Sequence, residues 1–160
     1  MFGSLRPMTS AYLAIKLLHI FLAITALGAN LTYGVWFALA ARRPAIAVPV
    51  MRGIKLLDDY IANPAYVLML PTGALMVWLG GLGFGTRWIA VSMSLWLVAM
   101  LLGFLGYSPL LRRHIATAER EGPDAPATRA VARRANVVTI LLAVDIFAIL
   151  ILMVFKPALG

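Results

Sequence analysis

Two long stretches of the chain without charged residues are separated by a single arginine. No charged residue occurs between Asp59 and Arg87, and none occurs between Arg87 and Arg112. Each stretch is mostly apolar and exceeds the roughly 20 residues that a helix needs to cross a bilayer. The pattern therefore predicts two membrane-spanning helices joined by a short turn near Arg87.

Two further apolar segments lead to the prediction of an all-α, four-helix membrane bundle. The last segment contains Asp145, which costs about 2.5–3.5 kcal/mol at the centre of a span, but its Leu, Ile, Val and Phe residues return about 4–8 kcal/mol. Charged residues make up only 12% of the chain, against about a quarter in soluble proteins. Within a single transmembrane domain, residues 1–160, the predicted spans are residues 11–41, 60–84, 88–111 and 137–155.

The distribution of basic residues predicts the orientation of the four spans. Ten of them fall in or beside the two longer loops, whereas Arg6, Arg87 and Lys156 fall on the other side. Because cytoplasmic loops are enriched in Lys and Arg, both longer loops are predicted to be cytoplasmic and both termini external. The ten are Arg42, Arg43, Arg52, Lys55, Arg112, Arg113, Arg120, Arg129, Arg133 and Arg134.

Several kinds of site are excluded by composition. The chain has no cysteine and two histidines, His19 and His114, which rules out thiolate metal sites, covalent haem attachment and a multi-histidine metal centre within one chain. The glycine-rich run from Gly80 lacks the strand before it and the Lys-Ser/Thr after it that a phosphate loop has. We predict no metal, and we assign the positive charge to membrane topology rather than to nucleic-acid binding.

A stripe of polar and small residues on the first span is the main candidate site. At 100° per residue, Lys16, His19 and Asn30 share one face, which is predicted to point into the bundle because polar groups are costly against lipid. Asp145 on the fourth span lies at a similar predicted depth. We therefore predict a buried polar cluster in which Asp145 pairs with His19, with Lys16 or with both.

Three functions compete for this cluster. The first is a non-catalytic accessory or structural bundle, in which the polar groups fix how the helices pack. The second is a redox protein that binds haem b through His19, with Lys16, a methionine or a second subunit as the other ligand. The third is a proton or small-solute transporter with a relay through Lys16, His19 and Asp145.

Other residues predict local features of the helices. Pro71 is expected to kink the second span, and Thr72 to compensate for the lost hydrogen bond. Asp58 and Asp59 are expected at the start of this span, after a short amphipathic helix at the membrane surface. Gly103 and Gly106 permit close helix contacts within the chain, with a second copy or with a membrane protein partner.

Three segments carry a resemblance to a known family. They are YLAIKLLHI in the first span, NPAYVLMLPTGALMVWLGG in the second and DIFAILILMVFKPAL at the end of the chain. In these segments the sequence resembles the bacterial predicted integral membrane proteins of domain of unknown function 2269. The resemblance covers nearly the whole chain and implies four membrane helices without an established activity. We expect a multi-pass protein of a bacterial inner membrane.

The pentapeptide KLLHI carries a second and shorter resemblance. It is similar to the first helix of the membrane four-helix protoporphyrinogen oxidases, in which the histidine serves haem chemistry. Only Lys16 and His19 match, and no lysine in a later helix corresponds to that family's second functional position. The resemblance therefore adds to the haem hypothesis at His19 and does not carry the oxidase activity over.

Overall fold

A computed structural model describes residues 10–157 of the chain, and all of its long elements are helices. Arg6, one of the basic residues used to predict the orientation, lies outside the described residues. In chain order the helices are α1 (Ser10–Arg42), the short η1 (Pro44–Ile46), α2 (Ala47–Leu57), η2 (Asp58–Ala62), α3 (Asn63–Leu79), α4 (Arg87–Leu101), η3 (Leu102–Tyr107), α5 (Ser108–Glu121) and α6 (Pro126–Phe155).

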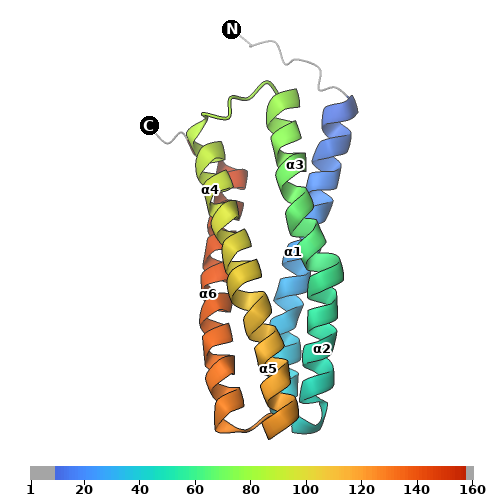
Figure 1. The fold of residues 1–160 in the computed structure, drawn as a ribbon. Helices are drawn as coiled ribbons and strands as arrows, with labels where there is room; N and C mark the ends of the chain where they lie inside the picture. Colours follow the sequence, from blue (N-terminus) through green and yellow to red (C-terminus); the bar gives the residue numbers. More distant parts are fainter. Residues whose placement is uncertain (1–9, 158–160) are drawn as a thin grey trace.

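These elements form four long columns, as Figure 1 shows. Each column is long and apolar enough to cross a membrane, and large apolar side chains such as Leu17, Leu31 and Phe155 point out of the bundle. Such an outer surface suits lipid, because acyl chains are as apolar as the side chains that they contact. The prediction of an all-α bundle with four membrane-spanning helices is confirmed.

The two middle columns each contain a wider helical turn. The amide of Asn63 donates to the carbonyl of Asp58, and the amide of Ser108 donates to that of Gly103, so both bonds connect residues five apart. Both turns immediately precede a proline, Pro64 or Pro109. Since proline has no amide proton and its ring clashes with the preceding turn of an α-helix, an i→i+5 turn accommodates it without ending the helix.

The amphipathic segment before the second span is therefore not a separate surface helix. It is α2, which continues through η2 into α3 as one column (Figure 1). Asp58 and Asp59 consequently lie inside this column rather than at its beginning. Pro71 lies within α3, which runs on to Leu79 as a helix, and the hydroxyl of Thr72 donates to the carbonyl of Leu68 at 2.8 Å.

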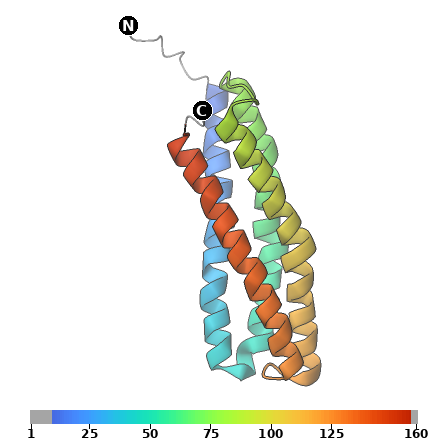
Figure 2. The same cartoon turned by 90° about the vertical axis from the view of Figure 1, so that its left-hand side faces the viewer.

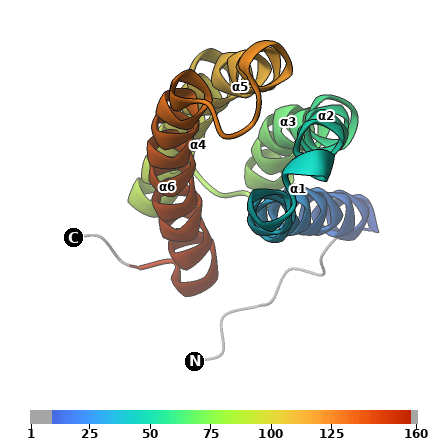
Figure 3. The same cartoon turned by 90° about the horizontal axis from the view of Figure 1, so that it is seen from below.

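The bundle consists of two hairpins. The column of α1 packs against α2, η2 and α3, whereas α6 packs against α4, η3 and α5. The hairpins meet between α2 and α5, where Tyr33, Ile54, Tyr107 and Leu111 form a buried core cluster. Seen from below, the two groups of helices lie on opposite sides of the bundle (Figure 3).

The beginning of α1 and the end of α6 lie at the same end of the bundle, and α6 runs along its whole length (Figure 2). The opposite end carries the connections from α1 to α2 and from α5 to α6. The second connection contains Gly122 with φ 95°, a conformation that glycine adopts without the steric cost of a Cβ atom. The ten basic residues used to predict the cytoplasmic side all lie in the half of the bundle that contains these connections, and Lys55 is buried there within α2.

Candidate functional site

His19 and Asn30 both face the second column. Nδ1 of His19 lies 2.8 Å from Oγ1 of Thr72, and the His19 ring packs closely against Gly73. Because the single proton of Thr72 is used by the carbonyl of Leu68, this geometry fits a tautomer in which Nδ1 of His19 donates. Through His19, the polar face of α1 contacts the α2–α3 column.

Asn30 binds a tyrosine from the same neighbouring column. Its Nδ2 donates to the carbonyl of Ala26 at 2.9 Å and to Oη of Tyr66 at 3.1 Å. The amide therefore satisfies part of its own hydrogen-bonding capacity within α1 and fixes the position of Tyr66. This leaves the hydroxyl proton of Tyr66 free to bind another group.

Asp145 does not join this set of residues. Among residues 10–157, no hydrogen bond or ion pair connects it to Lys16 or His19, and its Oδ2 atom is buried without a hydrogen-bond partner. The reason is the hairpin arrangement, since α1 and α6 belong to different hairpins. The predicted pairing is not formed, and the described contacts form no continuous relay through Lys16, His19 and Asp145.

A different buried polar cluster lies at the level of the two wide turns. Asp58 is 5% exposed, and its Oδ2 accepts a hydrogen bond from Nδ2 of Asn63 at 3.2 Å. Lys55, also buried, forms an ion pair with Asp59 one helical turn away. The spacing of Lys55 and Asp59 is the i,i+4 arrangement that favours such pairs, and it is the sequence signal that could have located this cluster.

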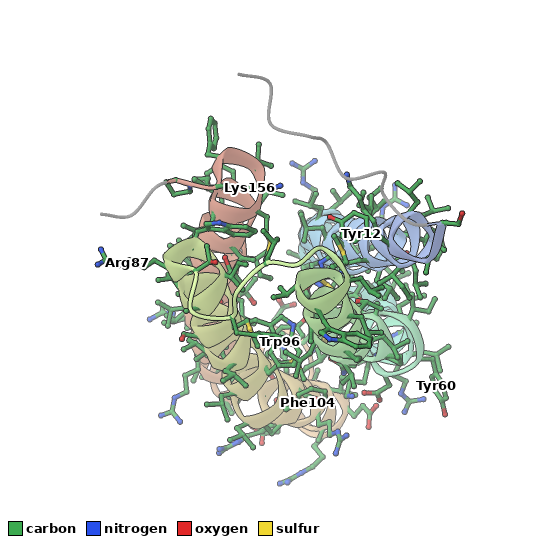
Figure 4. The ribbon with its side chains drawn as sticks, turned by 90° about the horizontal axis from the view of Figure 1, so that it is seen from above. Tyr12, Tyr60, Arg87, Trp96, Phe104 and Lys156 are labelled. Atoms are coloured by element: carbon green, nitrogen blue, oxygen red, sulfur yellow. The ribbon has the colours of Figure 1, made fainter. Side chains whose placement is uncertain are left out.

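Three tyrosines from different columns surround Asp58. Tyr33 of α1, Tyr66 of α3 and Tyr107 of η3 all interact electrostatically with its carboxylate. Tyr33 is 4% exposed and its hydroxyl has no hydrogen-bond partner. Tyr60 is different, because it points away from the bundle and is 76% exposed (Figure 4). Sequence reasoning missed the tyrosines because they lie far apart along the chain.

We call Tyr33, Tyr66 and Tyr107 the tyrosine cluster. A cavity of about 660 Å³ lies beside it. Its walls come mainly from α1 on one side and α6 on the other, and Leu31 and Phe147 line it although both are largely exposed. Such residues mark a lateral mouth between the two hairpins, at the surface that faces lipid. We call this space the lateral cavity.

The lining of the lateral cavity changes along its length. His114, Asp124 and Arg129 lie at the end near the α5–α6 connection, and the tyrosine cluster lines the middle. At the opposite end of the cavity the lining is apolar, with Leu27 and Leu150. A cavity with one polar end and one apolar end suits a molecule that is itself amphipathic.

A second and much smaller cavity adjoins the cluster. It measures about 30 Å³ and lies between the two wide turns, lined by Asp58, Asn63, Tyr66 and Tyr107 among others. This volume and these polar groups suit one water molecule, which needs two to four polar partners. Such a water would have the Asp58 carboxylate and the Asn63 amide among its partners.

A family model covers nearly the whole chain. The family model described as "Predicted integral membrane protein (DUF2269)" matches residues 13–157. The chain belongs to this family. No curated protein and no solved structure matches it, so the resemblance of KLLHI to the protoporphyrinogen oxidases is not supported.

In this DUF2269 protein His19 packs between α1 and α3, away from both cavities. The imidazole binds Thr72 and packs against Gly73, and His19 lines neither the lateral cavity nor the smaller one. No set of three metal-binding side chains occurs within residues 10–157. Both cavities lie at the tyrosine cluster instead.

His114 of this DUF2269 protein has an aromatic neighbour. It lies on α5, and its ring stacks on that of Phe37 with 6.3 Å between the ring centroids and 11° between the planes. Both residues line the lateral cavity. They give its polar end a flat aromatic wall.

Proposed function

We propose that the protein is a non-catalytic binding protein of the bacterial cytoplasmic membrane that takes up an amphipathic molecule from the bilayer. The lateral cavity carries this proposal, because it opens between α1 and α6 where acyl chains would surround the bundle. Its volume of about 660 Å³ falls within the roughly 300–1,000 Å³ that small-molecule sites occupy.

The depth of the tyrosine cluster supports uptake from the leaflet near the α1–α2 and α5–α6 connections. Asp58 follows the first residue of α2 by eleven positions, which corresponds to roughly 17 Å along the column at 1.5 Å per residue. The column from Pro44 to Leu79 has 36 residues and is about 54 Å long, so roughly 12 Å of it extends beyond each face of a hydrocarbon core about 30 Å thick. A polar group bound at the tyrosines would therefore remain in the inner half of the membrane while an apolar tail extends toward its centre.

The residues around the cavity favour binding over catalysis. His114 is its only histidine, and this residue stacks on Phe37 and makes no side-chain hydrogen bond to a nucleophile in the described part of the chain. Nucleophilic catalysis needs a base within hydrogen-bonding reach of the nucleophile. The tyrosine hydroxyls and the Asn30 amide at the cavity wall can instead recognise a ligand through hydrogen bonds.

Filling the cavity from α1 tests this proposal. Gly34 lines the cavity, and no atom lies within 4 Å of the position that a Cβ would take. Gly34→Phe is therefore expected to fold and to occupy the space with its ring. We expect the molecule extracted from purified wild-type protein, identified by mass spectrometry after solvent extraction, to fall at least five-fold in this variant.

Gly28→Phe is the matched control. Gly28 lies on the same helix with equally open surroundings and does not line the cavity. Both changes add the same ring and remove the same helix-destabilising glycine. Equal amounts of bound molecule in the two variants, or no bound molecule in the wild type, would contradict the proposal.

We further infer that the α1–α2 and α5–α6 connections face the cytoplasm, on the basis of the basic residues near them. The chain has no cysteine, so a single introduced cysteine reports its own position. In intact cells stripped of the outer membrane, Gly83→Cys is expected to react with a membrane-impermeant maleimide. Asp124→Cys should react only after the inner membrane is permeabilised; the reverse labelling would overturn the orientation.

A further inference from the structure

The tyrosine cluster offers more hydrogen-bond donors than the protein itself uses. The hydroxyl of Tyr33 is buried without a partner. Tyr66 accepts a bond from Asn30, and neither Tyr66 nor Tyr107 donates one within residues 10–157. A buried hydroxyl without a partner costs about 1–3 kcal/mol. An occupant of the lateral cavity that brings acceptor oxygens would remove this cost.

The charge beside the cluster limits the kind of acceptor. Asp58 interacts with all three tyrosines, and the adjacent ammonium of Lys55 is paired with Asp59. A second negative charge at the tyrosines would meet the Asp58 carboxylate in a region of low dielectric, where like charges repel strongly. A neutral polar group avoids this repulsion.

The polar end of the lateral cavity, near the α5–α6 connection, offers little attraction to an anionic headgroup. Arg129 is the only basic residue in the lining, it is exposed, and Asp124 lines the same end. An exposed arginine beside an exposed aspartate contributes little net attraction, since water and salt screen both charges. This argues against an anionic phospholipid as the preferred occupant.

The walls also favour a flat ring. Phe37 and His114 present stacked rings, and Tyr33, Tyr66 and Tyr107 line the middle of the cavity. Aromatic side chains bind planar groups by offset stacking or edge contacts. From this point an apolar tail has a route past Leu31 and Phe147 to the lateral mouth.

We propose that the occupant of the lateral cavity is an isoprenoid quinone, whose neutral ring accepts hydrogen bonds from the tyrosine hydroxyls through its carbonyl oxygens. Its isoprenoid tail leaves between α1 and α6. The inference rests on the proposed function and adds the chemical class of the ligand. No electron transfer is part of it.

Titration with a short-tailed quinone tests the proposal. Decylubiquinone is added to the full chain in phosphatidylcholine nanodiscs, and binding is followed by quenching of tryptophan fluorescence against empty nanodiscs. We expect saturable binding that Gly34→Phe abolishes and Gly28→Phe leaves unchanged. Tyr33→Phe is expected to weaken binding about five-fold, the loss of one hydrogen bond.

Tyr60→Phe provides the matched control, because this tyrosine is exposed on the outer surface. It should bind the quinone like the wild type. Tyr33→Phe should in addition unfold at the same temperature as the unliganded wild type or a higher one, since the hydroxyl that it loses has no partner. Weaker quinone binding without lower stability separates recognition from a structural role.

Other outcomes would overturn one proposal or both. The wild-type extract could contain a phospholipid that Gly34→Phe displaces, while the quinone shows no saturable binding. This result would refute the quinone as the occupant and would still support a binding site for an amphipathic molecule. Quinone binding that Gly34→Phe does not change would place the ligand elsewhere and refute this inference. Equal affinities of Tyr33→Phe and Tyr60→Phe would do the same, whereas an extract without any bound molecule would refute the proposed function.

Discussion

Lys55→Met is expected to destabilise the protein by about 2 kcal/mol, because it leaves the buried Asp58 without a neighbouring cation. The loss stays below the roughly 3–5 kcal/mol of a broken buried pair, since the side chain of Asp59, the partner of Lys55, is 38% exposed. Lys55 is buried and pairs with Asp59, and its charge also acts on Asp58. Methionine retains the length of the side chain, so the change removes the charge with little loss of packing. Unfolding by sodium dodecyl sulfate in bicelles, followed by circular dichroism, measures the effect.

Arg52→Met supplies the comparison one turn earlier on α2. Its partner is Glu119, with 2.7 Å between Nη2 and Oε1, but the Arg52 side chain is 67% exposed. Exposed ion pairs contribute about 0–1 kcal/mol, so this variant should stay close to the wild type. In the Lys55→Met background, Asp58→Asn should recover part of the lost stability. Equal losses for Lys55→Met and Arg52→Met would contradict a buried charge cluster.

The fold followed from the sequence because a bilayer imposes strict limits on a chain. A charge-free stretch such as the one between Arg87 and Arg112 has few alternatives to a spanning helix, since lipid offers no partner to backbone polar groups. The helices extend beyond the predicted spans, however. The prediction used the limits of the apolar runs, whereas α5 continues through Arg112 and Arg113 to Glu121.

The candidate site was predicted only in part. Helical periodicity placed His19 and Asn30 on one face of α1, and both do contact the second column. Periodicity within a helix does not determine which other helix it meets, so the expected contact with Asp145 was wrong. The structure places α6 in the other hairpin.

The aspartates illustrate a second limit. An acidic pair followed by Asn63 and Pro64 has the usual pattern of a helix beginning, which favoured a position at the membrane surface. The wide turn at Asp58–Ala62 instead accommodates the proline within a continuous column. Ser108-Pro109 repeats the arrangement after η3. The wide turns were not predicted from the sequence, because a proline does not by itself specify one: Pro71 lies within the α-helix α3.

Leu111→Ala should lower the free energy of unfolding by about 2–3 kcal/mol, because Leu111 lies where the two hairpins join. Leu111 is 1% exposed and packs with Tyr33, Ile54 and Tyr107 between α1, α2 and α5. Truncating a buried leucine costs about 2–5 kcal/mol in water-soluble proteins. The lower part of that range applies here, since helix association in a bilayer depends on packing rather than on transfer from water.

Leu105→Ala is the matched control, because Leu105 is 74% exposed on η3 and its truncation is expected to change stability by less than about 0.5 kcal/mol. Unfolding in bicelles compares the two variants. Leu111 also lines the lateral cavity, so Leu111→Ala enlarges the site and loosens its wall together. If both variants unfold alike, the α2–α5 contact does not hold the hairpins together, and the cavity between them would have no rigid frame.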